Sequence, residues 1–194
     1  MNNLAKINLD NYKPLRDEVL ENLRTANNVI GLRNLDDAIR IKEIAPKVKN
    51  IIILGAGLVG VDAMAGLLDY DAKVTMIEMG DRILPLQLDH YAANVYIERL
   101  KEEGVDFRFN VRAEKVIVDE NNNPVAIKLN TGEEVPGELI IACTGVRSNV
   151  GFLEGSGIEC DKFGLIFNPK GETNVKDVYG AGDISGRNPI WPTA

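Results

Sequence analysis

The sequence predicts an α/β fold, with a mostly parallel sheet, its helices and an antiparallel meander. First, Ile51 to Leu54 form a continuous aliphatic run, which is typical of a strand buried on both faces of a parallel sheet. Second, a strand, a glycine turn, a helix and another strand follow within residues 51–78, the size of a βαβ unit. Third, the middle of residues 105–143 alternates apolar and polar residues, as antiparallel strands with one solvated face do.

The first fifty residues predict two helices and a connecting strand. Residues 14–24 carry aliphatic side chains at four-residue spacing and a proline at the start, which indicates a short amphipathic helix. Residues 26–34 have the pattern of a strand followed by a loop. Residues 36–44 predict a second helix, because its first turn is acidic and a proline follows its end.

The βαβ unit and the segments after it account for most of the remaining elements. We expect a helix over residues 58–70 and a strand over residues 73–77. Asp89 is a suitable N-cap for a helix that ends near residue 103, before Gly104. Further strands are expected at residues 105–109, 112–119, 125–129 and 134–143, separated by turn residues. From residue 144 onward the sequence is glycine-rich and irregular.

Composition excludes several classes of function. A net charge of −7 and a pI near 4.9 argue against nucleic acid or an anionic membrane as a partner. No apolar run approaches the roughly 20 residues of a membrane span, and the N-terminus lacks the pattern of a secretory signal. The two cysteines are too few for a disulfide framework, so we expect a reducing, cytoplasmic compartment.

The glycine turn carries the first functional signal, G-x-G-x-x-G. Gly55 would make the tight turn, Gly57 would let the backbone approach a pyrophosphate, and Gly60 would let helix and strand pack closely. The first N–H groups of the helix would face the phosphates. The candidate nucleotide-binding residues of this turn are therefore Gly55, Ala56, Gly57, Leu58, Val59 and Gly60. The alternative is a plain packing turn with no ligand.

Glu78 is the acidic partner that a Rossmann-type dinucleotide site requires at the end of its second strand. It lies near the expected ~20 residues after the turn, where a carboxylate can accept hydrogen bonds from both ribose hydroxyls. A 2′-phosphate would be repelled there, so NAD is favoured over NADP. Met79 and Arg82 follow on the same loop, and Arg82 could in principle reach a phosphate. The alternative for Glu78 is a solvated carboxylate at a strand end.

A second string, T-x-x-x-x-V-Y-G-A-G-D, occupies residues 173–183. A short apolar strand leads into small residues that permit close approach of the backbone, and then into Asp183. That carboxylate can accept hydrogen bonds from a polyol. No further titratable residue of the chain is assigned to catalysis, and the single histidine has no second ligand at metal-binding spacing. Cys143 lies in an aliphatic run and is expected to be a buried, inert thiol.

Together the two strings resemble those of the pyridine nucleotide-disulfide oxidoreductase family of flavoproteins, over residues 28–194. In that family an NAD domain is inserted into an FAD domain. The resemblance assigns Asp183 to the ribityl chain of the flavin, Gly182 to close approach, and Gly145 to a turn near the nicotinamide. Relatives usually carry a glutamate where this chain has Asp62, which is therefore a candidate for positioning the nicotinamide.

The resemblance also predicts the domain organisation and the activity. We expect an N-terminal extension over residues 1–27, a Rossmann-type NAD-binding domain over 28–147, and a partial FAD-domain remnant over 148–194. The family's first FAD motif is not found in residues 1–24, so the chain is expected to be a fragment, inactive by itself. The parent enzyme would transfer hydride from NADH to FAD and on to a disulfide, redox protein or other acceptor. Its final acceptor and any homo-oligomer are left open.

Two alternatives of other classes remain at this point. One is a non-enzymatic NAD-sensing module built on the same glycine turn, although a sensor would have no use for the polyol contact of Asp183. The other is a short single-domain dehydrogenase, for which the sequence offers no Tyr-x-x-x-Lys pair or equivalent acid.

Overall fold

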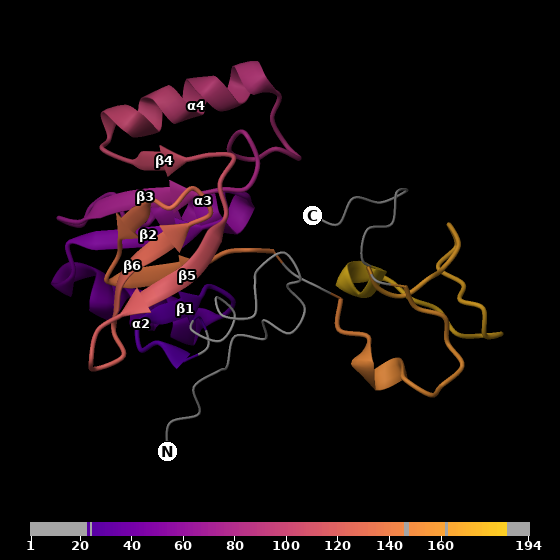
Figure 1. The fold of residues 1–194 in the computed structure, drawn as a ribbon. Coiled ribbons are helices and arrows are strands. Elements are labelled where there is room, and N and C mark those ends of the chain that lie inside the picture. The colour runs from indigo at the N-terminus through magenta and orange to yellow at the C-terminus, as the bar shows by residue number, and fades with distance from the viewer. Residues whose placement is uncertain (1–22, 24, 146–147, 162, 186–194) are drawn as a thin grey trace. The chain divides into compact units, whose positions relative to one another are not determined.

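The computed structural model describes residues 23, 25–145, 148–161 and 163–185 (Figure 1). The chain divides into two compact units, residues 1–145 and 146–194, and each is described by itself. Most of the helix expected over residues 14–24 lies outside the described residues. Leu23 is described and is 1% exposed.

The first unit is built on a five-stranded parallel sheet with the order β1–β8–β2–β3–β4 (Figure 1). Every neighbouring pair in this sheet is parallel. The strands are β1 (Val29–Gly31), β2 (Asn50–Leu54), β3 (Lys73–Ile77), β4 (Asp106–Arg108) and β8 (Leu139–Ala142). The predicted α/β class is confirmed.

Strand β2 lies in the middle of this sheet and is buried on both faces, as its aliphatic run predicts. Ile51 and Ile53 belong to a hydrophobic cluster that includes side chains of the helices α2 (Leu35–Ile44), α3 (Leu58–Ala65) and α4 (His90–Glu102). Ile52 and Leu54 point the other way, into a cluster shared with the second sheet. The unit therefore has three layers: helices, the parallel sheet and an antiparallel sheet.

Side chains at the helix starts explain where α2 and α4 begin. The side chain of Asn34 accepts a hydrogen bond from the Asp37 backbone N–H, and the Asp37 carboxylate accepts from the backbone N–H of Asn34. The carboxylate of Asp89 accepts from the Ala92 backbone N–H at 2.8 Å, as predicted from the sequence.

Helix α3 is shorter than expected, because it ends at Ala65 rather than near residue 70. Gly66 occupies the C-cap, where its low helix propensity favours termination. The chain continues in tight turns, with Leu67 N donating to Met64 O and Tyr70 N donating to Leu67 O. These i to i−3 bonds bring the chain around in time for β3 to begin.

The second sheet is the antiparallel meander β5 (Ala113–Val118), β6 (Pro124–Leu129) and β7 (Glu134–Pro136). The single strand expected over residues 134–143 is wrong, since β7 and β8 belong to different sheets. Pro136 lacks an N–H group for a further ladder bond. At Gly137 a Cβ would overlap the side chain of Ile52, so glycine lets the chain cross closely over β2.

The described part of the second unit contains little regular structure. It has two short 3₁₀ helices, η2 (Gly151–Leu153) and η3 (Gly182–Ser185), and isolated bridges that pair Cys160 with Leu165 and Glu172 with Tyr179. Leu165 packs where a Cβ on Gly180 would stand. The backbone N–H of Leu165 donates to Ile184 O at 2.7 Å, which ties η3 to this small core.

Candidate functional site

Three neighbouring strands deliver the candidate site at one edge of the parallel sheet. The carboxyl end of β2 leads into Gly55, that of β3 into Glu78, and that of β8 into Cys143 and Thr144. The Gly55 N–H donates to Ile77 O at 2.8 Å, so the first turn is fixed to β3. In open α/β sheets, ligands bind outside the carboxyl ends of the strands where the strand order reverses, and β2 lies at such a point.

Gly55 and Gly60 are required by the fold itself. Gly55 has φ +99, and a Cβ there would stand 2.5 Å from Cys143 O. A Cβ on Gly60 would overlap the carbonyl oxygen of Gly55. These two glycines therefore bring β2, α3 and the turn after β8 into close contact.

Gly57 differs, because a Cβ there would meet no atom within 4 Å. It is the N-cap of α3 and supplies no side-chain cap. The first intrahelical bond runs from Val61 N to Gly57 O, so the N–H groups of Leu58, Val59 and Gly60 have no acceptor within the helix. The site thus combines open space beside the backbone with N–H groups and the positive end of the helix dipole, which suits an anion.

The carboxylate of Glu78 bridges two backbone turns. Its Oε2 accepts from the Ala56 N–H at 2.8 Å, and its Oε1 accepts from the Gly80 N–H at 2.7 Å. Each carboxylate oxygen can accept more than one hydrogen bond, so both retain capacity for a ligand hydroxyl. The side chain is therefore fixed in place beside the glycine turn, and its contact with a ribose stays a prediction.

A pocket of about 220 Å³ lies directly beside this carboxylate. It is lined by the ends of β2 and β3 with Gly55, Glu78 and Met79, by residues 111–113, and by Thr144. The volume is below the roughly 300–1,000 Å³ of sites that enclose a whole drug-sized ligand. It suits one part of a dinucleotide, with the pyrophosphate outside it at the start of α3.

Arg82 is turned toward its own loop instead of toward a ligand. Its Nε donates to Leu88 O at 3.2 Å and its Nη2 to Pro85 O at 3.1 Å, while its Nη1 donates to Asp81 at 2.7 Å. All three nitrogens of the guanidinium thus have partners within residues 81–88. These bonds use three of its five N–H donors, and a contact of Arg82 with a phosphate stays a prediction. Met79, by contrast, is 48% exposed and lines the pocket.

Sequence reasoning missed the third wall of the pocket, Val111, Arg112 and Ala113. These residues follow β4 at the same carboxyl edge of the sheet. The Val111 N–H donates to Glu78 O at 3.3 Å, and Asn110 N–H to Gly80 O at 2.9 Å. Their position after a strand that runs parallel to β3 is the feature from which the sequence could have indicated them.

Asp62, Gly145 and Cys143 are the remaining residues of the first unit that the sequence analysis singled out. Asp62 is exposed on α3; its carbonyl oxygen accepts from the Gly66 N–H at 3.1 Å, and its side chain makes no hydrogen bond or ion pair with the residues that the structure describes. Gly145 has φ +101 after β8, as a tight turn requires. Burial raises the pKa of the Cys143 thiol to about 12, so its thiolate is scarce near neutral pH. This agrees with the predicted inert thiol.

In the second unit, Gly182 and Asp183 open the 3₁₀ helix η3. Gly182 has φ +75, a conformation that favours glycine. Asp183 is exposed, and its carbonyl oxygen accepts from Ser148 Oγ at 2.6 Å. Asp183 is therefore an accessible residue at the start of a short helix, with its backbone held by Ser148.

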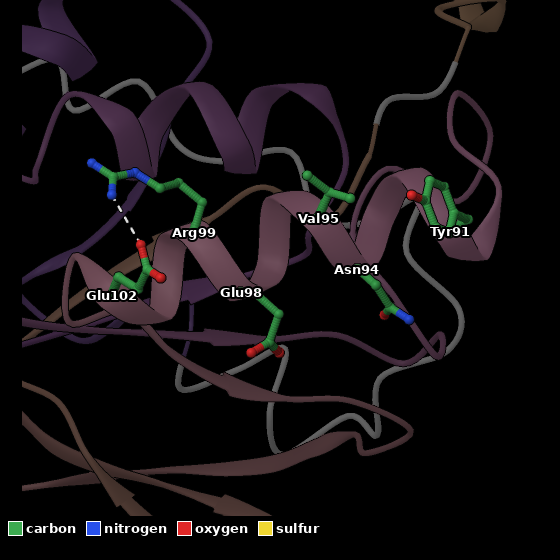
Figure 2. A pocket seen from close by; sticks show the side chains of 6 residues that line it. All are labelled: Tyr91, Asn94, Val95, Glu98, Arg99 and Glu102. Carbon is green, nitrogen blue, oxygen red and sulfur yellow. Dashed lines mark hydrogen bonds and ion pairs between the residues drawn. The ribbon is translucent and has the colours of Figure 1, made fainter.

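A second hollow lies on the outer face of α4 and is unrelated to the glycine turn (Figure 2). Figure 2 shows Tyr91, Val95, Glu98 and Glu102 along this helix, with Arg99 bonded to Glu102 at 2.9 Å. Tyr91 is 82% exposed, so the hollow is an open surface rather than an enclosed site.

The part of the chain that the structure describes holds no group of three or more His, Cys, Asp or Glu side chains that could bind a metal ion. It also holds no helix with the length and apolar character needed to cross a membrane.

Comparison with known proteins places this geometry in a family. A sequence model of pyridine nucleotide-disulphide oxidoreductases matches residues 14–194. The ferredoxin–NAD(+) reductase component of the 3-phenylpropionate/cinnamic acid dioxygenase from Photorhabdus laumondii is 30% identical over 171 residues, covering 88% of this chain and 41% of that protein. Dihydrolipoyl dehydrogenase from Acholeplasma laidlawii is 34% identical over 140 residues, covering 72% of this chain and 40% of that protein.

A solved structure extends the likeness to the fold. A ferredoxin reductase from Rhodopseudomonas palustris superposes with a TM-score of 0.78 at 21% identity, over 84% of this chain and 40% of that one. The chain spans about 40% of the length of these relatives. The chain therefore belongs to the pyridine nucleotide-disulphide oxidoreductase family, whose members use NAD(H) and FAD.

Proposed function

We propose that the chain is the NAD(H)-binding part of a flavoprotein oxidoreductase, which transfers hydride from NADH to FAD and on to a disulfide, a redox protein or another acceptor. The observation that carries the proposal is the open face at Gly57. There, unpaired N–H groups of α3 adjoin a pocket that holds the Glu78 carboxylate. The backbone donors match the pyrophosphate of an adenosine diphosphate, and the acidic acceptor matches its ribose hydroxyls.

Different residues of the site would bind different parts of the dinucleotide. The N–H groups of Leu58 and Val59 donate to the pyrophosphate, which approaches over Gly57. The adenosine occupies the 220 Å³ pocket, where the Glu78 oxygens accept from the ribose hydroxyls. The nicotinamide end then extends past the Gly145 turn, toward which Asp62 contributes a positioning carboxylate.

The flavin side of the proposal rests on the second unit. The positive φ of Gly182 allows close approach of a ligand to the backbone, and Asp183 offers an exposed carboxylate to the ribityl hydroxyls. FAD, when bound, supplies the hydride acceptor, while the protein binds and orients both cofactors. Electron transfer from the flavin to the final acceptor belongs to the parent enzyme.

Binding of NADH to the Gly57→Ala variant tests the proposal. A Cβ at this position meets no protein atom, so the fold tolerates it, but it stands where the pyrophosphate must approach. Losing one charge-assisted hydrogen bond costs roughly 1.5–3 kcal/mol, which weakens binding by about one to two decades. We expect that loss in calorimetric titrations, together with a loss of about 1 kcal/mol or less in stability, because alanine is a poorer N-cap than glycine.

Gly66→Ala is the matched control. Its Cβ makes only ordinary contacts with the carbonyl oxygens of Ala63 and Asp62, at the other end of α3. It should bind NADH as the wild type does. An undetectable affinity of the wild type for NADH, or equal affinities of the two variants, would contradict the proposed site.

A further inference from the structure

Arg112 lines the same pocket as Glu78, and its guanidinium is only partly paired. Its Nε is buried with no hydrogen-bond partner among the residues that the structure describes. Its Nη2 forms an ion pair with Glu114 Oε1 at 3.6 Å, which is longer than a hydrogen bond, and the side chain is 38% exposed. A guanidinium carries five N–H donors, so this single ion pair leaves donors for an acceptor on a ligand.

The backbone holds this side chain at a defined point. The Arg112 N–H donates to Asn130 Oδ1 at 2.7 Å, and its carbonyl oxygen accepts from the Asn130 N–H at 2.8 Å. One residue earlier, the Val111 N–H donates to Glu78 O at 3.3 Å. Residues 110–112 therefore run alongside residues 78–80, and Glu78 and Arg112 line one pocket from adjacent segments.

The neighbouring arginine, Arg82, is held by its own loop. The guanidinium nitrogens of Arg82 are all bonded within their own loop, to Leu88 O, Pro85 O and Asp81. Arg112 makes one ion pair, to Glu114, so it has more donors left for a ligand beside Glu78 than Arg82 has.

We propose that Arg112 determines how the site treats the 2′ position of the adenosine ribose, an inference that rests on the proposed NAD(H) site. Glu78 accepts from a free 2′-hydroxyl and repels a 2′-phosphate. Arg112 opposes that repulsion, because its guanidinium donates to the phosphate oxygens with a geometry that suits them. The site therefore binds NADH and also accepts NADPH, and the balance is set by this pair of side chains.

The test is a cycle of variants of the whole chain, titrated with NADH and NADPH by calorimetry at one ionic strength. Arg112→Gln should weaken the binding of NADPH by about 10- to 100-fold and the binding of NADH by less than about threefold. Glu78→Ala should strengthen the binding of NADPH, and this gain in affinity should disappear in the double variant that also carries Arg112→Gln. Arg112→Lys keeps the charge and loses the fork of donors, so it should retain part of the NADPH affinity.

Arg99→Gln is the control for net charge, since Arg99 lies on the outer face of α4 (Figure 2). It should leave the affinities for both cofactors within about twofold of the wild type. Thermal unfolding of each variant establishes that it is folded. If Arg112→Gln changes NADH and NADPH equally, or changes neither, the inference is wrong while the NAD(H) site stands. If the wild type binds neither cofactor, the proposed function fails as well.

Discussion

At the residue scale, Glu78 is both a structural and a binding group. Its two oxygens each accept a backbone N–H, from Ala56 and from Gly80, so the carboxylate holds the glycine turn and the following loop at a fixed distance. Glu78 also lines the pocket. A variant of Glu78 therefore changes stability as well as affinity, and the two effects need a control that separates them.

Glu78→Ala should lower the affinity for NADH and raise the affinity for NADPH. Loss of the ribose acceptor costs about one to two decades of NADH affinity. Removing the negative charge favours the 2′-phosphate, so NADPH responds in the opposite direction. Loss of the two backbone contacts should also lower the free energy of unfolding by about 2 kcal/mol. Calorimetric titration with both cofactors, and denaturant unfolding, measure the three quantities.

Glu138→Ala is the matched control for that variant. The Glu138 carboxylate likewise accepts two backbone N–H groups, from Lys49 and Asn50, but at the amino end of β2. It should lose similar stability and leave both affinities unchanged. Equal responses of NADH and NADPH to Glu78→Ala would remove the reason for assigning Glu78 to the ribose.

The two arginines illustrate how far sequence reasoning reaches at this scale. The glycines and Glu78 could be located, because the motif fixes their spacing along the chain. Arg82 was chosen on the same basis, yet its donors serve the loop in which it lies. Arg112 is 34 positions after Glu78 and reaches the pocket only because β4 pairs with β3, a pairing that spacing along the chain does not reveal.

At the scale of elements, the glycine turn is the joint that fixes β2, α3 and the end of β8 to one another. Glycine stands at its three positions for different physical reasons: Gly55 has a positive φ, Gly60 packs against a carbonyl oxygen, and Gly57 faces open space. Only the first two are demanded by the fold. A comparison of alanine variants can therefore separate folding from binding within a single motif.

Gly60→Ala should destabilise the protein more than Gly57→Ala, which costs only the difference between glycine and alanine as an N-cap. The added Cβ would overlap the Gly55 carbonyl oxygen, which is backbone and cannot rotate away. Overpacking of this kind costs about 1–3 kcal/mol or more in free energy of unfolding. Urea denaturation of both variants measures the difference. Equal stabilities would mean that the α3 contact is looser than the structure has it.

Element boundaries depart from the sequence pattern where two structures compete for the same residues. The aliphatic residues after Ala65 predict a continuing helix, but Gly66 and the short path to β3 end it. Residues 134–143 read as one apolar strand, although the chain passes from the antiparallel sheet to the parallel one at Gly137. Both differences depend on contacts with β2 or β3, which the local pattern does not contain.

At the scale of the whole molecule, the apolar core is distributed unequally between the two units. Both hydrophobic clusters consist of residues 23–143. In the described part of the second unit, Leu165 is the only hydrophobic side chain that is fully buried, and Phe152 and Tyr179 are 71% and 63% exposed. The candidate nucleotide site, from Gly55 to Thr144, also lies wholly within the first unit.

This distribution predicts that the first unit folds and binds NADH without the second. A chain shortened to residues 1–145 keeps both clusters, the glycine turn and the pocket, so its NADH affinity should stay within about twofold of the whole chain. Residues 146–194 alone should show no cooperative unfolding, because so little apolar surface is buried among those described. Calorimetric titration of the first piece and thermal unfolding of both pieces by circular dichroism provide the measurements. Loss of NADH binding from residues 1–145, with its cooperative unfolding retained, would mean that the second unit contributes residues to the nucleotide site. In that case the pocket beside Glu78 could not by itself account for the affinity, and the assignment of the adenosine to it would have to be abandoned.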